Sequence, residues 1–136
     1  GTAPFVVVAR KGHPRVDGAI DLETYLALDH IVATARPYGA GMEDMALERM
    51  GLGRRVAVRC QHAITAWQIL ASSDMLFSLP RSHAEVLGAM WPMQLLAMPL
   101  PVDQGGSYLY WHLAADADPG LRWLRGIIAD ELGKAE

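Results

Sequence analysis

Hydrophobic residues in this chain fall into short runs separated by polar, proline or glycine breaks. Five of these runs predict strands, at 5–10, 30–34, 54–60, 75–80 and, in a shorter form limited by prolines, 95–101. Four intervening segments carry apolar positions at helical spacing and predict helices, at 22–28, 41–51, 64–73 and 81–90. Strands that alternate with helices of about ten residues are typical of an α/β sandwich with a largely parallel sheet.

Three of these segments carry more specific signals. The run FVVVAR at 5–10 is continuous and β-branched, which predicts a strand buried on both faces. Asp21 is placed to cap the helix at 22–28. In the segment 41–51 one helical face is formed by Met42, Met45, Ala46 and Met50, with charged residues opposite. We therefore expect these methionines to pack into the core.

The C-terminal stretch YWHLAADADPGLRWLRGIIADEL combines two patterns. Residues 108–113 alternate polar or aromatic with apolar side chains, which predicts a strand with two different faces. Asp118 and Pro119 then form a good helix start, and Gly133 is placed to end the helix. The apolar face of this helix consists of Leu121, Leu124, Ile127, Ile128 and Leu132. We expect Trp123 in this helix, like Trp67 upstream, to be a core residue rather than a ligand contact.

Composition and charge narrow the classes of protein. A chain of 136 residues with 51% hydrophobic composition can bury one core and is too short for two independent domains. Twelve Lys and Arg against fifteen Asp and Glu give a net charge of -3, with no basic stripe for phosphate contacts, so we expect no DNA binding by this chain alone. No apolar run of about 18 residues occurs, which predicts a soluble protein without membrane contact. The chain opens directly into a buried-type strand, which suggests a fragment.

Catalytic and metal chemistry is not indicated. The five histidines lack the close spacing of a metal site such as HExxH. Cys60 and His62 are too close along a strand end to indicate a nucleophile and its base, and a single cysteine is compatible with a reducing cytoplasm. The glycine pairs GAG and GLG lack the third glycine of a dinucleotide loop. The sequence therefore predicts no metal, no cofactor and no enzymatic activity.

The order of motifs resembles the effector-binding domain of LysR-type transcriptional regulators, and most of all the branch that includes the nodulation regulators. The resemblance runs from about Phe5 to Leu132 and is carried by VVVARKGHPR, IDLETYLALDHIVAT, GLGRRVAV, DMLFSLPRS, PLP, YLYWH and DPGLRWLR. It implies the two-lobed α/β fold of type 2 periplasmic binding proteins, with a small-molecule site between the lobes. It further implies a homo-oligomeric, cytoplasmic regulator that contacts DNA through an N-terminal helix-turn-helix, which has no counterpart here.

By this resemblance, residues 11–104 form the second lobe, while residues 1–10 and 105–136 belong to the first lobe and the crossovers, and the N-terminal part of the first lobe is absent. The terminal strand and helix would close the first lobe and supply core.

Candidate effector contacts follow from the fold, because ligands of α/β proteins sit beyond the carboxyl ends of strands, beside helix N-termini. Thr34 ends one predicted strand and Pro80 another, and Arg10 lies at the expected crossover. The segment Gln61, His62, Ala63 and Ile64 precedes a predicted helix, where effector contacts of the family also tend to fall. Such positions favour a carboxylate or aromatic effector. Three of these residues have alternative roles: a solvated cap for His62, helix capping or strand termination for Thr34, and an ion pair with an acid across the lobes for Arg10.

Two functional classes remain open. The first is a ligand-sensing regulatory domain without catalysis, whose lobes shift when an effector binds. The second is a solute-binding protein of the same fold. A fold alone does not decide between them.

Overall fold

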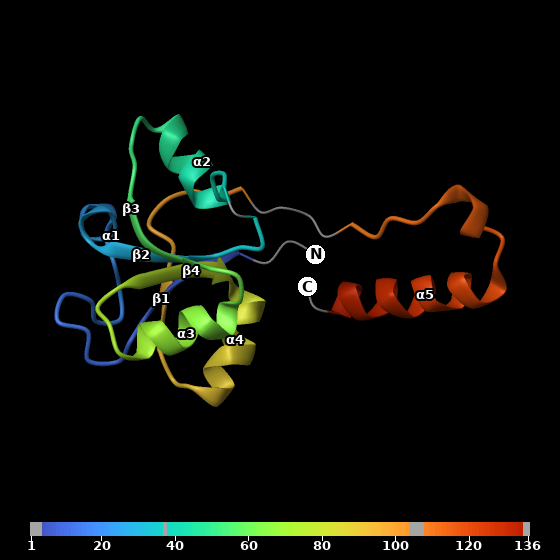
Figure 1. Cartoon of the computed structure of the whole chain (residues 1–136). Coiled ribbons are helices and arrows are strands. Elements are labelled where there is room, and N and C mark those ends of the chain that lie inside the picture. Colours follow the sequence, from blue (N-terminus) through green and yellow to red (C-terminus); the bar gives the residue numbers. More distant parts are fainter. Residues whose placement is uncertain (1–3, 37, 104–107, 135–136) are drawn as a thin grey trace. The chain divides into compact units, whose positions relative to one another are not determined.

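The computed structural model describes residues 4–36, 38–103 and 108–134. They fall into two compact units, one formed by Pro4–Asp103 and one that contains residues 108–134 (Figure 1). The larger unit holds a five-stranded sheet with helices on both faces, which confirms the α/β class.

The sheet has the strand order β3-β2-β4-β1-β5. Its strands are β1 (Phe5–Ala9), β2 (Asp29–Ala33), β3 (Arg55–Cys60), β4 (Leu76–Pro80) and β5 (Gln94–Ala97). β2 is parallel to β3 and to β4, whereas β1 is antiparallel to both β4 and β5. The expectation of a largely parallel sheet was therefore wrong, and the sheet is mixed. The reason is that β1 runs in the reverse direction between two neighbours, so each of its pairings is antiparallel.

β1 is buried on both faces, as its continuous apolar run predicted. Val6 and Val8 belong to one core cluster, and Val7 and Ala9 belong to the cluster on the other face. Because β1 is hydrogen-bonded between β4 and β5, the compact unit begins at Pro4 rather than at residue 11. The assignment of residues 1–10 to the first lobe and the crossovers stays a prediction.

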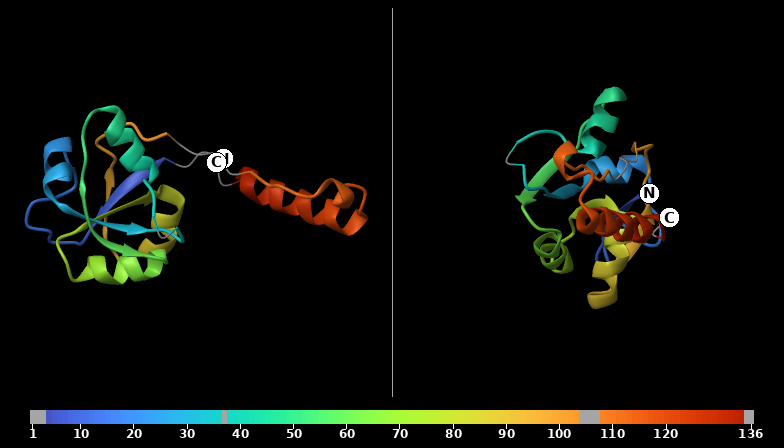
Figure 2. Two further views of the ribbon diagram at one scale, coloured as in Figure 1. Left: turned by 45° about the horizontal axis from the view of Figure 1, so that its top comes forward. Right: turned by 90° about the vertical axis from the view of Figure 1, so that its right-hand side faces the viewer.

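The helices of this unit are α1 (Leu22–Ala27), α2 (Met42–Arg49), α3 (Ala63–Ala71) and α4 (Arg81–Met90). α1 and α2 pack on one face of the sheet, and α3 and α4 on the other (Figure 2). The predicted cap of α1 is confirmed, since Asp21 Oδ1 accepts a hydrogen bond from the Thr24 N–H at 2.7 Å. Trp67 of α3 is fully buried, as expected.

The buried face of α2 differs from the predicted one. Met45 and Met50 are 48% and 46% exposed, so the expectation that they pack into the core was wrong. The residues of α2 that turn inward are Glu43, Ala46 and Leu47. Helical periodicity alone favoured the methionines, but Arg54 lies beneath this helix and forms ion pairs with its acids. That long-range pairing rotates the helix away from its most apolar face.

The second unit contains a short 3-10 turn, η1 (Leu113–Ala115), and the long helix α5 (Pro119–Lys134). The predicted cap is confirmed, because Asp118 Oδ1 accepts a hydrogen bond from the Leu121 N–H at 2.9 Å. Gly133 does not end the helix, which continues to Lys134.

Two predictions for this unit were wrong. Residues 108–112 are not a strand, because no other strand pairs with them among the described residues. Trp123 is 68% exposed and is not a core residue of this structure. Trp111, in contrast, is held by Arg125, whose guanidinium lies 4.6 Å from the centre of the Trp111 ring.

No helix in the described ranges is both long and apolar enough to cross a membrane.

Candidate functional site

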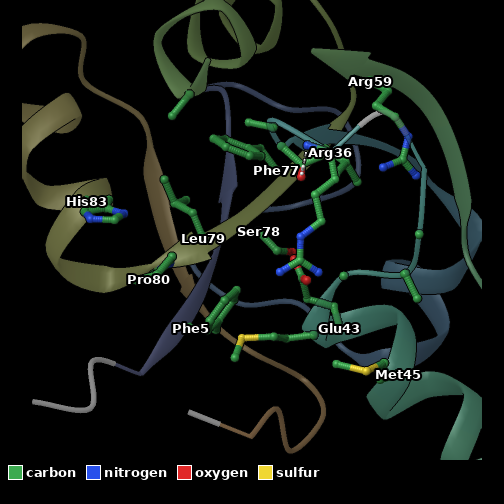
Figure 3. Close-up of a pocket in the computed structure, with 18 of the residues that line it drawn as sticks. Phe5, Arg36, Glu43, Met45, Arg59, Phe77, Ser78, Leu79, Pro80 and His83 are labelled. Carbon is green, nitrogen blue, oxygen red and sulfur yellow. Dashed lines mark hydrogen bonds between the residues drawn. The ribbon is translucent and has the colours of Figure 1, made fainter. Parts of the chain in front are cut away.

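A pocket of about 490 Å³ lies in the larger unit, where β2, β3 and β4 reach their carboxyl ends (Figure 3). Its floor and walls come from four places in the chain: the last residues of these strands, Phe5 at the start of β1, the loop that follows β2, and the first turns of α2, α3 and α4. Since β1 runs in reverse, it is the amino end of β1 that meets the pocket. The volume falls within the range of small-molecule sites, roughly 300–1,000 Å³.

Two arginines give this pocket positive character. Arg36 enters from the loop after β2, and Arg59 from β3 (Figure 3). Both side chains are exposed, and neither forms an ion pair with any residue that the structure describes. Apolar side chains, among them Phe5 and Phe77, line the pocket beside them. The pocket thus combines apolar surface with guanidinium groups that form no ion pair among the described residues, which suits an organic anion.

A buried polar network lies behind one wall of the pocket and is centred on Arg54. The Arg54 side chain is 1% exposed, and its Nε lies 2.6 Å from Asp44 Oδ1. Its Nη1–H donates to Tyr25 Oη at 3.0 Å, and its Nη2 lies 3.7 Å from Glu43 Oε1. Tyr25 Oη in turn lies 3.2 Å from Ser78 Oγ. Glu43 and Ser78 both line the pocket, so the network reaches the ligand space at two points.

The acids of this network titrate differently because their partners differ. Burial raises the pKa of Glu43, and the charge of Arg54 only partly offsets this effect. Burial would also raise the pKa of Asp44, but hydrogen bonds from Arg54 and the Gly41 N–H outweigh it and hold that pKa below its usual value. Burial raises the pKa of Tyr25, so its phenol keeps its proton at neutral pH.

Three of the predicted site residues line this pocket: Thr34, Ala63 and Pro80. Thr34 Oγ1 accepts a hydrogen bond from the Arg36 N–H at 3.1 Å, so its hydroxyl also shapes the loop that carries the arginine. The Thr34 N–H donates to the Cys60 carbonyl at 2.8 Å, which ties the ends of β2 and β3 together.

The other residues around the start of α3 are close in sequence but do not line the pocket. Gln61, His62 and Ile64 are exposed. His62 is the N-cap residue of α3, yet its side chain makes no cap hydrogen bond. Cys60 Sγ donates to the His62 carbonyl at 3.6 Å rather than to its ring, so the two do not form a nucleophile and base pair.

Arg10 does not lie at the pocket. Its Nη2 is 2.7 Å from Asp74 Oδ1, and Asp74 precedes β4, whereas the pocket is at the other end of that strand. The reversed direction of β1 explains this placement, because it puts Phe5 at the pocket and Arg10 at the opposite edge of the sheet. Arg10 thus forms an ion pair, but its partner Asp74 belongs to the same compact unit.

Sequence reasoning missed Arg36, Arg59, Glu43 and Ser78. One signal was present: Ser78 is the single polar residue inside the apolar run MLFSLP, and a buried polar residue needs a partner. Nothing in the local pattern marked the two arginines, because each stands in an ordinary exposed position of a loop or strand. No cluster of potential metal ligands occurs in the described part of the chain.

Comparison with known proteins gives a consistent result. Residues 1–133 match the family model described as LysR substrate binding domain. The HTH-type transcriptional activator NagR of Ralstonia sp is 28% identical over 131 residues, covering 96% of this chain and 44% of that protein. Nodulation protein D 2 of Rhizobium leguminosarum bv. phaseoli is 27% identical over 134 residues, covering 98% of this chain and 42% of its own length. The chain thus spans less than half the length of the curated relatives it matches.

Solved structures show the same fold. The probable transcriptional regulator PA0477 from Pseudomonas aeruginosa is 37% identical, with a TM-score of 0.70, over 76% of this chain and 35% of that one. The effector binding domain of BenM with its effector benzoate is 11% identical, with a TM-score of 0.58, over 74% of this chain and 48% of that one. The effector binding domain of QuiR in complex with shikimate is 15% identical, with a TM-score of 0.58, over 90% of this chain and 61% of that one.

Proposed function

We infer that this chain, which belongs to the LysR substrate binding domain family and has the type 2 periplasmic-binding-protein-like fold, is the ligand-sensing part of a transcriptional regulator. The observation that carries this inference is the pocket at the carboxyl ends of β2, β3 and β4, where apolar walls lie beside two arginines that form no ion pair with the residues the structure describes. Such a site suits a small molecule, and among its described lining residues no nucleophile is hydrogen-bonded to a base, so we propose binding rather than catalysis. The curated relatives are regulators, which does not favour the solute-binding alternative.

In this proposal the effector is a small organic anion. The residues proposed to contact it divide into three groups. Thr34, Ala63 and Pro80 contact it at the strand ends and at the start of α3. Gln61 and His62 precede α3, and Ile64 stands in its first turn; all three are exposed beside the lining residue Ala63. In this proposal they contact the part of the molecule that extends out of the pocket. Arg36 supplies the charge. BenM and QuiR were solved with benzoate and shikimate, both carboxylates, which supports this class of ligand.

The whole protein is, in this proposal, a cytoplasmic homo-oligomer in which effector binding alters the disposition of DNA-binding domains. The chain itself carries a net charge of -3, so DNA contacts belong to a segment outside it. An electrophoretic shift assay of this chain with promoter DNA is expected to show no sequence-selective binding.

The proposal is tested by calorimetric titration of the chain with a panel of carboxylates, including acetate, succinate, benzoate and shikimate, beside the corresponding neutral amides. We expect at least one carboxylate to bind, and its amide to bind less tightly. Arg36→Met is expected to weaken carboxylate binding about tenfold or more, because a charge-assisted contact is lost. The matched control is Arg15→Met, which removes an exposed arginine remote from the pocket and keeps the same change in net charge. Equal losses in both variants, or no binding by any carboxylate, would overturn the proposal.

A further inference from the structure

We propose that Ser78 is the hydrogen-bond donor that fixes an effector carboxylate in the pocket, and that Tyr25 and Arg54 are positioning residues that direct its hydroxyl proton toward the ligand. This inference rests on the proposed function and adds to it a specificity-determining group. It follows from the sequence of donors and acceptors in the buried network behind the pocket wall.

Arg54 determines which atom donates in each hydrogen bond of the network, since a guanidinium can donate hydrogen bonds but cannot accept them. The contact of 3.0 Å between Arg54 Nη1 and Tyr25 Oη therefore has Arg54 as its donor. Arg54 is held in place on its other side by Asp44, at 2.6 Å from Nε. The Arg54 side chain is 1% exposed, so its guanidinium is shielded from bulk water.

Because Tyr25 Oη accepts a hydrogen bond from Arg54, its own proton must be donated to another group. Its side chain is buried, and among the described residues Ser78 Oγ, at 3.2 Å, is the only acceptor within reach of the phenol proton. If Ser78 were the donor in this contact, the phenol proton would be buried without an acceptor, which is unfavourable. When Tyr25 donates to Ser78, the buried phenol proton has an acceptor. Burial also raises the pKa of Tyr25, so the proton is retained.

Ser78 is consequently left with a hydroxyl proton and no acceptor for it. In the described part of the chain its Oγ has no hydrogen-bond partner other than Tyr25. Ser78 lies in β4, opposite Val7 of β1, and lines the pocket beside Phe77 and Leu79 (Figure 3). The hydroxyl proton is therefore available to a molecule in the pocket.

The chemistry of the ligand follows from this donor. Arg36 and Arg59, which also line the pocket, carry only donors and positive charge. A carboxylate oxygen accepts from Ser78 while its charge is balanced by a guanidinium, and apolar walls receive the rest of the molecule. An ammonium group fits neither requirement. The structure thus assigns the pocket to organic acids and places one of their oxygens at Ser78.

The first test compares Ser78→Ala with wild type in calorimetric titrations with benzoate, shikimate and succinate. We expect the tightest carboxylate to lose about tenfold or more in affinity, because a hydrogen bond to a charged group is removed. The matched control is Ser73→Ala. Ser73 has a buried Oγ without a hydrogen-bond partner among the described residues and does not line the pocket, so this variant is expected to retain wild-type affinity.

The second test separates positioning from mere structural support by a double-mutant cycle. Tyr25→Phe removes the phenol oxygen and keeps the ring, and is expected to weaken carboxylate binding several-fold. In the Ser78→Ala background the same change is expected to have no further effect on affinity, because Tyr25 acts only through Ser78. Thermal melts of all four proteins show whether each is folded at the titration temperature. Additive losses in the cycle would overturn the positioning role of Tyr25.

The outcomes also distinguish this inference from the proposed function. If carboxylates bind and Arg36→Met weakens them while Ser78→Ala does not, the pocket is the effector site and the role of Ser78 is wrong. If no carboxylate of the panel binds to wild type, both are wrong. If affinity falls for Ser78→Ala but falls equally for Ser73→Ala, the loss reports general destabilisation and the inference is overturned.

Discussion

Protonation of His30 is expected to control the acid stability of this domain. His30 lies in β2 with its side chain fully buried, and its ring packs edge-on against the ring of Tyr25 at a centroid distance of 4.4 Å. Its Nε2 is 2.7 Å from the Tyr25 carbonyl oxygen, while Nδ1 has no hydrogen-bond partner in the described residues. A neutral ring with the proton on Nε2 fits this environment, and a charged ring does not.

The size of the effect follows from the pKa. Burial lowers the pKa of His30 from 6.5 to about 4, despite the hydrogen bond to the Tyr25 carbonyl. At one unit per about 1.4 kcal/mol, this shift corresponds to about 3 kcal/mol of stability. The pKa of His30 is lower in the folded protein than in the unfolded chain. The neutral ring therefore makes its full contribution to the free energy of unfolding above about pH 6.5, and this contribution is lost as pH falls from about 6.5 toward about 4. By about pH 5, roughly 2 kcal/mol of it has gone.

The assay is urea unfolding of wild type and His30→Gln at about pH 7.5 and about pH 5, followed by the fluorescence of the tryptophans. Glutamine retains an N–H donor for the Tyr25 carbonyl but does not titrate. The difference in unfolding free energy between the two proteins should therefore shift by about 2 kcal/mol, with wild type losing more as pH falls. His83→Gln is the matched control, since this histidine is exposed already in the folded state. Parallel pH dependences for wild type and His30→Gln would refute the reasoning.

Four further outcomes are expected. Arg54→Met should cost about 3–5 kcal/mol in unfolding free energy, because it leaves buried carboxyl groups without their cation, and urea unfolding measures the loss. Trp67→Ala should cost about 3–5 kcal/mol in the same assay, since the ring is fully buried between α3 and the sheet. Arg10→Ala should cost less than about 1 kcal/mol, because its ion pair with Asp74 is 31% and 52% exposed, and it should leave carboxylate affinity unchanged. His62→Ala should weaken carboxylate binding several-fold and leave the melting temperature nearly unchanged; an unaltered affinity would remove His62 from the site.

Local signals in the sequence determined most of the secondary structure. The apolar runs of β1 and β4 and the capping residues Asp21 and Asp118 act within a few positions of the chain, so their effect can be read from neighbouring residues alone. The resemblance of the ordered motifs then indicated the family and the fold. For the same reason the strand ends at Thr34 and Pro80 could be placed at the pocket before the structure was known.

Pairing between distant segments of the chain decided the direction and the pairing of the strands, which local patterns do not contain. Hydrophobic periodicity reports which side of an element is apolar, but not the direction in which a strand runs between its neighbours. The reversed direction of β1 is therefore a tertiary property, and it moved Arg10 to the far edge of the sheet. Residues 108–112 have an alternating pattern but do not form a strand, because such a pattern forms a strand only when another strand pairs with it.

The polar network behind the pocket also depended on the tertiary structure. Tyr25 is 29 residues from Arg54 and 53 residues from Ser78 along the chain, and no local rule links such positions. Packing of α1 and α2 on one face of the sheet brings them within hydrogen-bond distance. The sequence by itself determined which elements form, because their formation depends on near neighbours. The hydrogen-bond network that joins Arg54, Tyr25 and Ser78 was decided only when these distant residues were buried together.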